Sequence, residues 1–191
     1  MNTNAVMSPV LILPGLGGSG ETHWQSHWLN KHDFCQRVEQ DNWNIPEPQS
    51  WINALQQAVS ACSSPPLLVA HSLGCSLVAH WAERHHNVPV KGALLVAPSD
   101  IESEDHTPME VRCFAPMPMV RLPFPSTVVA SSNDPYVDIQ RAQLFATAWG
   151  ADFVNVGDCG HINADSHLKD WAEGWSYLME LNALQGMSCR A

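Results

Sequence analysis

The sequence has few basic residues and no long apolar run. Its 191 residues include 9 lysines and arginines against 19 acidic residues, which gives a formal net charge of −10. A chain this acidic repels phosphate backbones and anionic lipid headgroups, so we expect neither nucleic acid nor a membrane among its partners. The longest apolar stretches, such as residues 93–98, are far shorter than the roughly 20 residues that cross a bilayer. Residues 1–8 also lack the basic and apolar regions of a signal peptide, so we expect a cytoplasmic protein.

Cysteine pairs with the spacing of a metal or redox site are also missing. The 6 cysteines include no C-x-x-C pair, so no zinc ribbon or thioredoxin-type motif is encoded. Cys75 and Cys159 lie close in sequence to candidate catalytic residues, and a redox or metal role is the alternative to the commoner buried thiol. We expect structural thiols, no metal and no other cofactor.

The composition is that of one folded domain. Hydrophobic residues make up 45% and charged residues 15% of the chain, unlike a disordered chain of low hydrophobicity and high charge. A core of roughly 100 to 200 residues buries enough apolar surface to fold without disulfides or metals. We therefore expect residues 1–191 to form a single domain.

Short apolar runs alternate with stretches of helical periodicity along the chain. The expected strands are residues 10–13, 34–38, 67–70, 91–97, 126–131 and 151–156. Two helices are expected to begin after the N-caps Thr22 and Ser50. Three more are expected over residues 73–85, 138–149 and 166–181. This order predicts an α/β fold with an open, mainly parallel sheet and helices on both faces.

Residues 100–125 interrupt this alternation with five prolines and no clear period. Ligands of an open parallel sheet bind at the carboxyl ends of the strands, and a long connection leaving one of those ends can cover the site. The segment is therefore either a short cap over the site or a plain surface excursion.

The strongest local pattern is LLVAHSLG at residues 67–74, which places a serine between an apolar run and a helical stretch. The pattern is typical of the nucleophile elbow G-x-S-x-G, with Ala70 in place of the first glycine. Small residues suit Ala70 and Gly74 because larger side chains would collide where strand and helix meet. Ser72 could merely cap the helix, but its place after a buried strand favours a nucleophile.

A serine nucleophile needs a general base and a carboxylate that orients the base. Asp134 follows the expected strand 126–131, and His161 follows the last expected strand. Ser72, Asp134 and His161 therefore occur in the order serine, acid, histidine, each on a loop beyond a strand end, as in α/β-hydrolases. These three residues are the predicted catalytic set.

Three other residues compete for these roles. Asp100 also follows a strand and is the alternative acid. His71 precedes the nucleophile, and we expect its ring to point away from it. His167 is expected to begin the last helix rather than to act as the base.

An oxyanion hole needs two backbone donors, one after the nucleophile and one in the loop after an early strand. Leu73 supplies the first, and Leu16 in the segment PGLGG at residues 14–18 is the best candidate for the second. A phosphate-binding loop is the competing interpretation. It is disfavoured because neither G-x-G-x-x-G nor the Walker pattern is present.

The helix expected after the glycine loop carries His23 and His27 one turn apart. Such a pair can bind zinc, but the glutamate of H-E-x-x-H is missing. We therefore expect these side chains to pack against the glycine loop. The other tryptophans are expected to pack in the core or between helices, among them Trp51, Trp81, Trp149, Trp171 and Trp175.

The chain resembles the small serine hydrolases that include bacterial YdeN and the retinoblastoma-binding serine hydrolase. The resemblance lies in residues 14–28, 70–74, 132–134 and 160–164, with Trp171 and Gly174 beyond them, and so spans nearly the whole chain. It implies a compact α/β-hydrolase whose triad is Ser72, Asp134 and His161. Retinoblastoma binding is not implied, because the L-x-C-x-E motif is absent.

The residues and the resemblance together predict a serine hydrolase of esterase or amidase type. It would cleave a small-molecule ester or amide through an acyl-enzyme on Ser72. The alternative is a non-catalytic binding protein on a hydrolase scaffold, because a fold does not fix a function.

Overall fold

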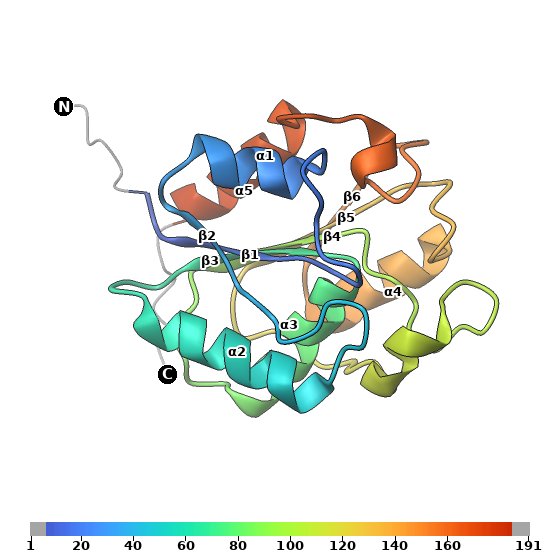
Figure 1. The fold of residues 1–191 in the computed structure, drawn as a ribbon, viewed down its shortest axis with the longest axis horizontal. Coiled ribbons are helices and arrows are strands. Elements are labelled where there is room, and N and C mark those ends of the chain that lie inside the picture. Colours follow the sequence, from blue (N-terminus) through green and yellow to red (C-terminus); the bar gives the residue numbers. More distant parts are fainter. Residues whose placement is uncertain (1–6, 185–191) are drawn as a thin grey trace.

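The computed structural model describes residues 7–184, which form one β-sheet with helices on both faces (Figure 1). The strands are β1 (Val10–Leu13), β2 (Cys35–Arg37), β3 (Leu67–His71), β4 (Gly92–Val96), β5 (Ser126–Ala130) and β6 (Asp152–Asn155). They lie in the order β2-β1-β3-β4-β5-β6, and each neighbouring pair is parallel. The expected open parallel sheet is confirmed.

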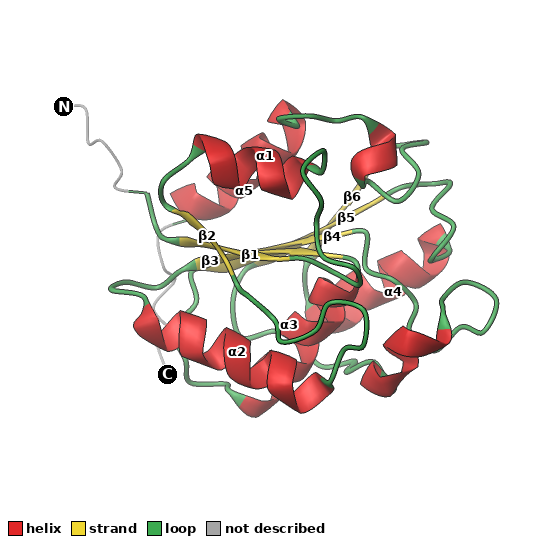
Figure 2. Cartoon of the chain, in the orientation of Figure 1, coloured by secondary structure: helices red, strands yellow, loops and turns green. Residues whose placement is uncertain are grey.

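The helices cover the sheet in two layers (Figure 2). They are α1 (Trp24–Lys31), α2 (Pro48–Ala61), α3 (Leu73–Arg84), α4 (Ile139–Trp149) and α5 (Ala172–Ala183), with short 3₁₀ turns η1 (Met109–Phe114) and η2 (Ala164–Ser166). Helices α1 and α5 share one hydrophobic cluster with one face of the sheet, and α2, α3 and α4 share another with the opposite face.

The four central strands are buried along their whole length, whereas the edge strands β2 and β6 are partly exposed. Central strands covered on both faces read as continuous apolar runs, which is why the sequence identified them without alternation. The tryptophans expected in the core are buried or partly buried there.

Three helices begin at other residues than expected. His23, not Thr22, caps α1, and its Nδ1 accepts a hydrogen bond from the Gln25 amide. Helix α2 begins earlier, at Pro48, because the Glu47 carboxylate caps it. The last helix begins at Ala172, because a capping box forms η2 and left-handed residues follow it.

The segment 100–125 carries η1 and is anchored to the body of the protein. Six of its apolar side chains are buried in the cluster that contains α2, α3 and α4: Ile101, Val111, Phe114, Met117, Leu122 and Phe124. Its first part, up to η1, follows β4 at the carboxyl end of the sheet. The segment therefore has a fixed place beside the strand ends where the expected site residues lie.

No helix within residues 7–184 is long and apolar enough to span a bilayer. The five cysteines in the described part of the chain are unpaired, and Cys75 is buried. Cys189 and residues 1–6, most of the stretch expected to lack a signal peptide, lie outside the described residues.

Candidate active site

Ser72 lies on the sharp turn between β3 and α3. Its backbone has φ 54° and ψ −122°, a conformation that is strained for a residue with a side chain. A Cβ atom added to Gly74 would lie 2.4 Å from the backbone oxygen of Leu13. The expectation that only a very small residue fits at Gly74 is confirmed, because α3 packs its first turn directly on the end of β1.

The glycine loop after β1 lies against this turn. A Cβ added to Gly15 would be 2.9 Å from the Cβ of Ser72 and 3.1 Å from the Leu73 nitrogen. The amide of Gly17, at φ 75°, donates to the backbone oxygen of Trp43 and holds the loop in place. The predicted oxyanion donors, Leu16 and Leu73, therefore belong to two backbone segments in direct contact.

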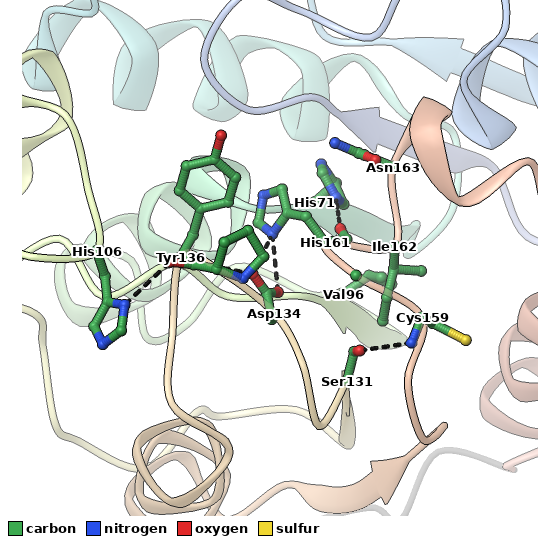
Figure 3. Close-up of polar contacts among 12 residues, drawn as sticks. His71, Val96, His106, Ser131, Asp134, Tyr136, Cys159, His161, Ile162 and Asn163 are labelled. Atoms are coloured by element: carbon green, nitrogen blue, oxygen red, sulfur yellow. Dashed lines mark hydrogen bonds and ion pairs between the residues drawn. The ribbon is translucent and has the colours of Figure 1, made fainter.

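The loops after β5 and β6 are joined by side-chain to backbone hydrogen bonds. The Cys159 amide donates to Ser131 Oγ at 2.9 Å (Figure 3), and the Gly160 amide donates to Asn133 Oδ1 at 2.7 Å. Ser131 Oγ also lies 2.9 Å from the Gly157 oxygen. These contacts fix the loop that carries the predicted acid relative to the loop that carries the predicted base.

The structure brings Asp134 and His161 together at the end of these loops (Figure 3). His161 Nδ1 lies 2.9 Å from Asp134 Oδ2 and 3.0 Å from Oδ1. Asp134 Oδ1 also accepts a hydrogen bond from the Tyr136 amide at 2.9 Å. The Asp134 side chain is fully buried, so its carboxylate can hold His161 Nδ1 protonated and leave Nε2 as the basic nitrogen.

The competing acid and base lie elsewhere. Asp100 Oδ2 is 3.2 Å from Arg141 Nε, and Asp100 Oδ1 accepts from the Glu102 amide. His167 is exposed at the end of η2 and does not begin the last helix.

His71 does not point away from the site as the sequence suggested. Its Nε2–H donates to the backbone oxygen of His161 at 2.9 Å (Figure 3), and it lines the same cavity as Ser72. Alternation along β3 puts His71 on the same face as Val69, the face that α1 and α5 cover. Burial, together with the neighbouring His161 and His23, lowers the pKa of His71 well below its usual value.

Helix α1 supports the His161 loop from the other side. Trp24 Nε1 donates to the backbone oxygen of Ile162 at 2.8 Å, directly after His161. Gln25, fully buried, donates to the Val69 oxygen and accepts from Ser19 in the glycine loop. Helix α1 thus contacts the glycine loop through Gln25 and the His161 loop through Trp24.

The two histidines at the start of α1 do not form a joint site. His27 is partly exposed and lies 3.4 Å from Asp170, whereas His23 is buried and lines the cavity beside Ser72. Within residues 7–184 no group of three His, Cys, Asp or Glu side chains is arranged to hold a metal ion. The His23 amide donates to the Gly20 oxygen, so His23 packs against the glycine loop as expected, whereas His27 lies near Asp170, shortly before α5.

A cavity of about 280 Å³ lies between the segments that carry the predicted site residues. The glycine loop, the elbow, the His161 loop and segment 100–125 all contribute to its wall, the last through Thr107, Pro108 and Val111. Among the residues that the structure describes, no lysine, arginine, aspartate or glutamate lines it. Its polar lining consists of histidine, serine, threonine, tyrosine and asparagine side chains and of backbone groups.

A model of the serine hydrolase family matches residues 10–180. The chain belongs to the serine hydrolase family. A YdeN-like hydrolase from Pectobacterium atrosepticum is 32% identical to it, and its crystal structure superposes with a TM-score of 0.82 over 92% of this chain and 91% of its own. The family resemblance expected from the motifs is confirmed.

Other similar proteins match this serine hydrolase over a shorter stretch or at lower identity. The hydrolase YdeN of Bacillus subtilis is 32% identical over 79 residues, 39% of this chain, so the sequence match spans only 41% of that relative. The YdeN structure, 20% identical, covers 90% of this chain and 97% of its own with a TM-score of 0.70. An esterase from a Rhodococcus species is 13% identical with a TM-score of 0.67, covering 95% and 93% of the two chains. At these identities the two structures establish the α/β-hydrolase fold alone.

Sequence reasoning missed the roles of His71 and Trp24 in holding the His161 loop. The alternation of β3 was a usable signal for His71, because it assigns that ring to the face opposite Ala70. No local pattern connects Trp24 with Ile162, which are 138 residues apart.

Proposed function

We propose that this serine hydrolase cleaves a small, uncharged ester or amide through an acyl-enzyme on Ser72. The observation that carries the proposal is the buried Asp134–His161 hydrogen bond at the wall of the cavity that Ser72 also lines. Fold alone would not support an activity, but this pairing lies beside a strained serine at a helix start.

In the proposed reaction the Ser72 hydroxyl attacks the substrate carbonyl while His161 Nε2 accepts its proton. The Leu16 and Leu73 amides hold the oxyanion, and the imidazolium stays paired with Asp134. The bond to the leaving group then breaks, and His161 returns the proton to that group. Water, activated by the same histidine, hydrolyses the acyl-enzyme and regenerates Ser72.

We further propose that segment 100–125 is a short cap over this site rather than a plain surface excursion. Three of its residues line the cavity, and its Asp100 amide donates to the Tyr136 oxygen beside the predicted acid. Shortening of the cap would then broaden the range of acyl groups accepted.

A fluorophosphonate probe tests the mechanism directly. We expect stoichiometric labelling of the folded protein at Ser72, none in Ser72→Ala, and strongly slowed labelling in His161→Ala. His167→Ala serves as the matched control and should label like the unmodified protein. Absence of labelling in the folded, unmodified protein would refute the proposal and favour a non-catalytic binding protein.

A further inference from the structure

The cavity wall contains polar atoms without a hydrogen-bond partner among the described residues, and one of them belongs to His23. His23 is only 5% exposed, yet its Nε2 has no hydrogen-bond partner among the described residues. Buried polar groups are nearly always hydrogen-bonded, so such an atom next to a binding cavity points to a missing ligand. His23 lines the cavity together with Ser72 and His161.

The protonation of His23 follows from its other ring nitrogen. Nδ1 accepts a hydrogen bond from the Gln25 amide at 3.1 Å, so the neutral ring must carry its proton on Nε2. Burial lowers the pKa of His23 to about 4, and the neighbouring His161 acts in the same direction. His23 therefore presents a fixed, uncharged N–H donor at neutral pH.

The position of His23 is also fixed. Its ring lies edge-on to His71, with centroids 4.7 Å apart, and His71 in turn lies 4.8 Å from the ring of His161. The three rings form a row that runs from the predicted base to the start of α1. Because His23 and Ser72 line the same cavity of about 280 Å³, an oxygen bound at His23 Nε2 would share that cavity with the scissile carbonyl.

The buried hydroxyl of Ser99 is a second polar group in this wall without a partner. Ser99 is 3% exposed, lines the same cavity, and its Oγ has no partner among the described residues. Two orphaned polar groups make this part of the wall polar, whereas a pocket for a plain alkyl chain would have apolar walls.

We propose that His23 is a substrate-binding residue whose Nε2–H selects acyl groups that carry an uncharged acceptor oxygen near the scissile carbonyl. The acyl group is the part concerned, because His23 is buried and the leaving group must reach solvent while the acyl group stays on Ser72. The absence of cationic side chains from the lining favours a hydroxyl, ether or carbonyl oxygen over a carboxylate. This inference rests on the proposed acyl-enzyme mechanism.

Matched pairs of esters, in which one oxygen atom replaces one CH₂ group of the acyl chain, test the proposed role of His23. We would compare p-nitrophenyl methoxyacetate with the butanoate, 3-methoxypropanoate with the pentanoate, and 4-methoxybutanoate with the hexanoate. The ratio of kcat/KM within each pair, divided by the ratio for hydroxide-catalysed hydrolysis, gives the oxygen preference. We expect at least one pair to show a preference of about three- to tenfold, the value of one neutral hydrogen bond.

Two variants separate substrate binding from helix capping. Asparagine is a strong N-cap but is too short to replace Nε2, so His23→Asn should keep the helix and lose the oxygen preference. The longer amide in His23→Gln can replace the Nε2–H donor while capping poorly, and it should retain much of the preference. His23→Ser, also a good N-cap without the donor, replaces the asparagine variant if that protein fails to fold.

The opposite order of the variants would overturn the inference. If His23→Asn keeps the preference, or if both members of every pair slow equally, His23 only caps α1. Absence of any preference in the unmodified protein would also refute the proposal. Fluorophosphonate labelling of Ser72 in the same samples distinguishes these results from a failure of the hydrolase mechanism itself.

Discussion

Replacement of Asp134 by asparagine tests the proposed triad, because the Asp134 side chain is fully buried against His161. The carboxylate accepts from two directions, with Oδ1 near both the Tyr136 amide and His161 Nδ1 and Oδ2 near Nδ1 alone. An amide has one acceptor oxygen and one donor nitrogen. If the oxygen stays on the Tyr136 amide, the new NH₂ group faces His161.

An NH₂ group facing His161 Nδ1 selects the wrong tautomer. The imidazole would then carry its proton on Nε2 and could not accept the Ser72 proton. The flipped amide is no better, because its NH₂ group would face the Tyr136 N–H and leave a buried donor unpaired, at a cost of about 1–3 kcal/mol. We therefore expect kcat to fall about ten-thousand-fold in Asp134→Asn, or about 5 kcal/mol of transition-state stabilisation, with little change in KM.

Steady-state hydrolysis of a p-nitrophenyl ester, on protein shown to be folded by circular dichroism, provides the measurement. Asp100→Asn is the matched control, because Asp100 also follows a central strand but pairs with Arg141 near the surface. It should change kcat less than tenfold. A mild effect at Asp134 together with a severe effect at Asp100 would refute the assignment of the acid.

Three further predictions concern the frame of the site. Gly74→Ala should lower the free energy of unfolding by about 1–3 kcal/mol in urea titrations and slow probe labelling, since its Cβ would meet the Leu13 oxygen at 2.4 Å. Trp24→Phe should cost a similar 1–3 kcal/mol, because it leaves the Ile162 oxygen without its donor. Unfolding free energy should also fall as pH drops from 6.5 to about 4, because the lowered pKa of His23 lets only the unfolded state take up the proton. For His23 alone the loss is about 3 kcal/mol, and His23→Asn should show a correspondingly flatter pH profile; an unchanged profile would contradict this account.

The strands and the order of the site residues could be read from the sequence because they depend on local chemistry. A buried parallel strand is a short apolar run, and Ser72 and Asp134 each follow such a run, whereas His161 follows the partly exposed edge strand β6. The helix starts were less predictable, since several residues near each start are good caps. The caps in the structure, Glu47 and His23, do not belong to the residue types with the strongest N-cap preference.

The hydrogen bonds between segments far apart in the chain could not be predicted from the sequence. The hydrogen bond from His71 to His161 joins residues 90 positions apart, and the bond from Gly160 to Asn133 joins residues 27 apart. Side-chain alternation along a strand predicts which face of the sheet each side chain occupies, but it does not predict which loop packs on that face. Local pattern therefore identified the reacting groups, while the supporting contacts needed the tertiary structure.

Backbone strain at the strand ends bears on whether the scaffold works as an enzyme or only binds. Ser72, Ala97 and Ile162 all have positive φ values, of 54°, 49° and 47°, and the last two are fully buried. Such conformations cost about 1–3 kcal/mol each and persist only where the surrounding structure imposes them. Ser72 holds its hydroxyl at the cavity, and Ile162 follows directly on His161, with its oxygen held by Trp24. A protein that only binds has no need of a strained serine beside a positioned histidine, so the strain at these two places favours the catalytic proposal.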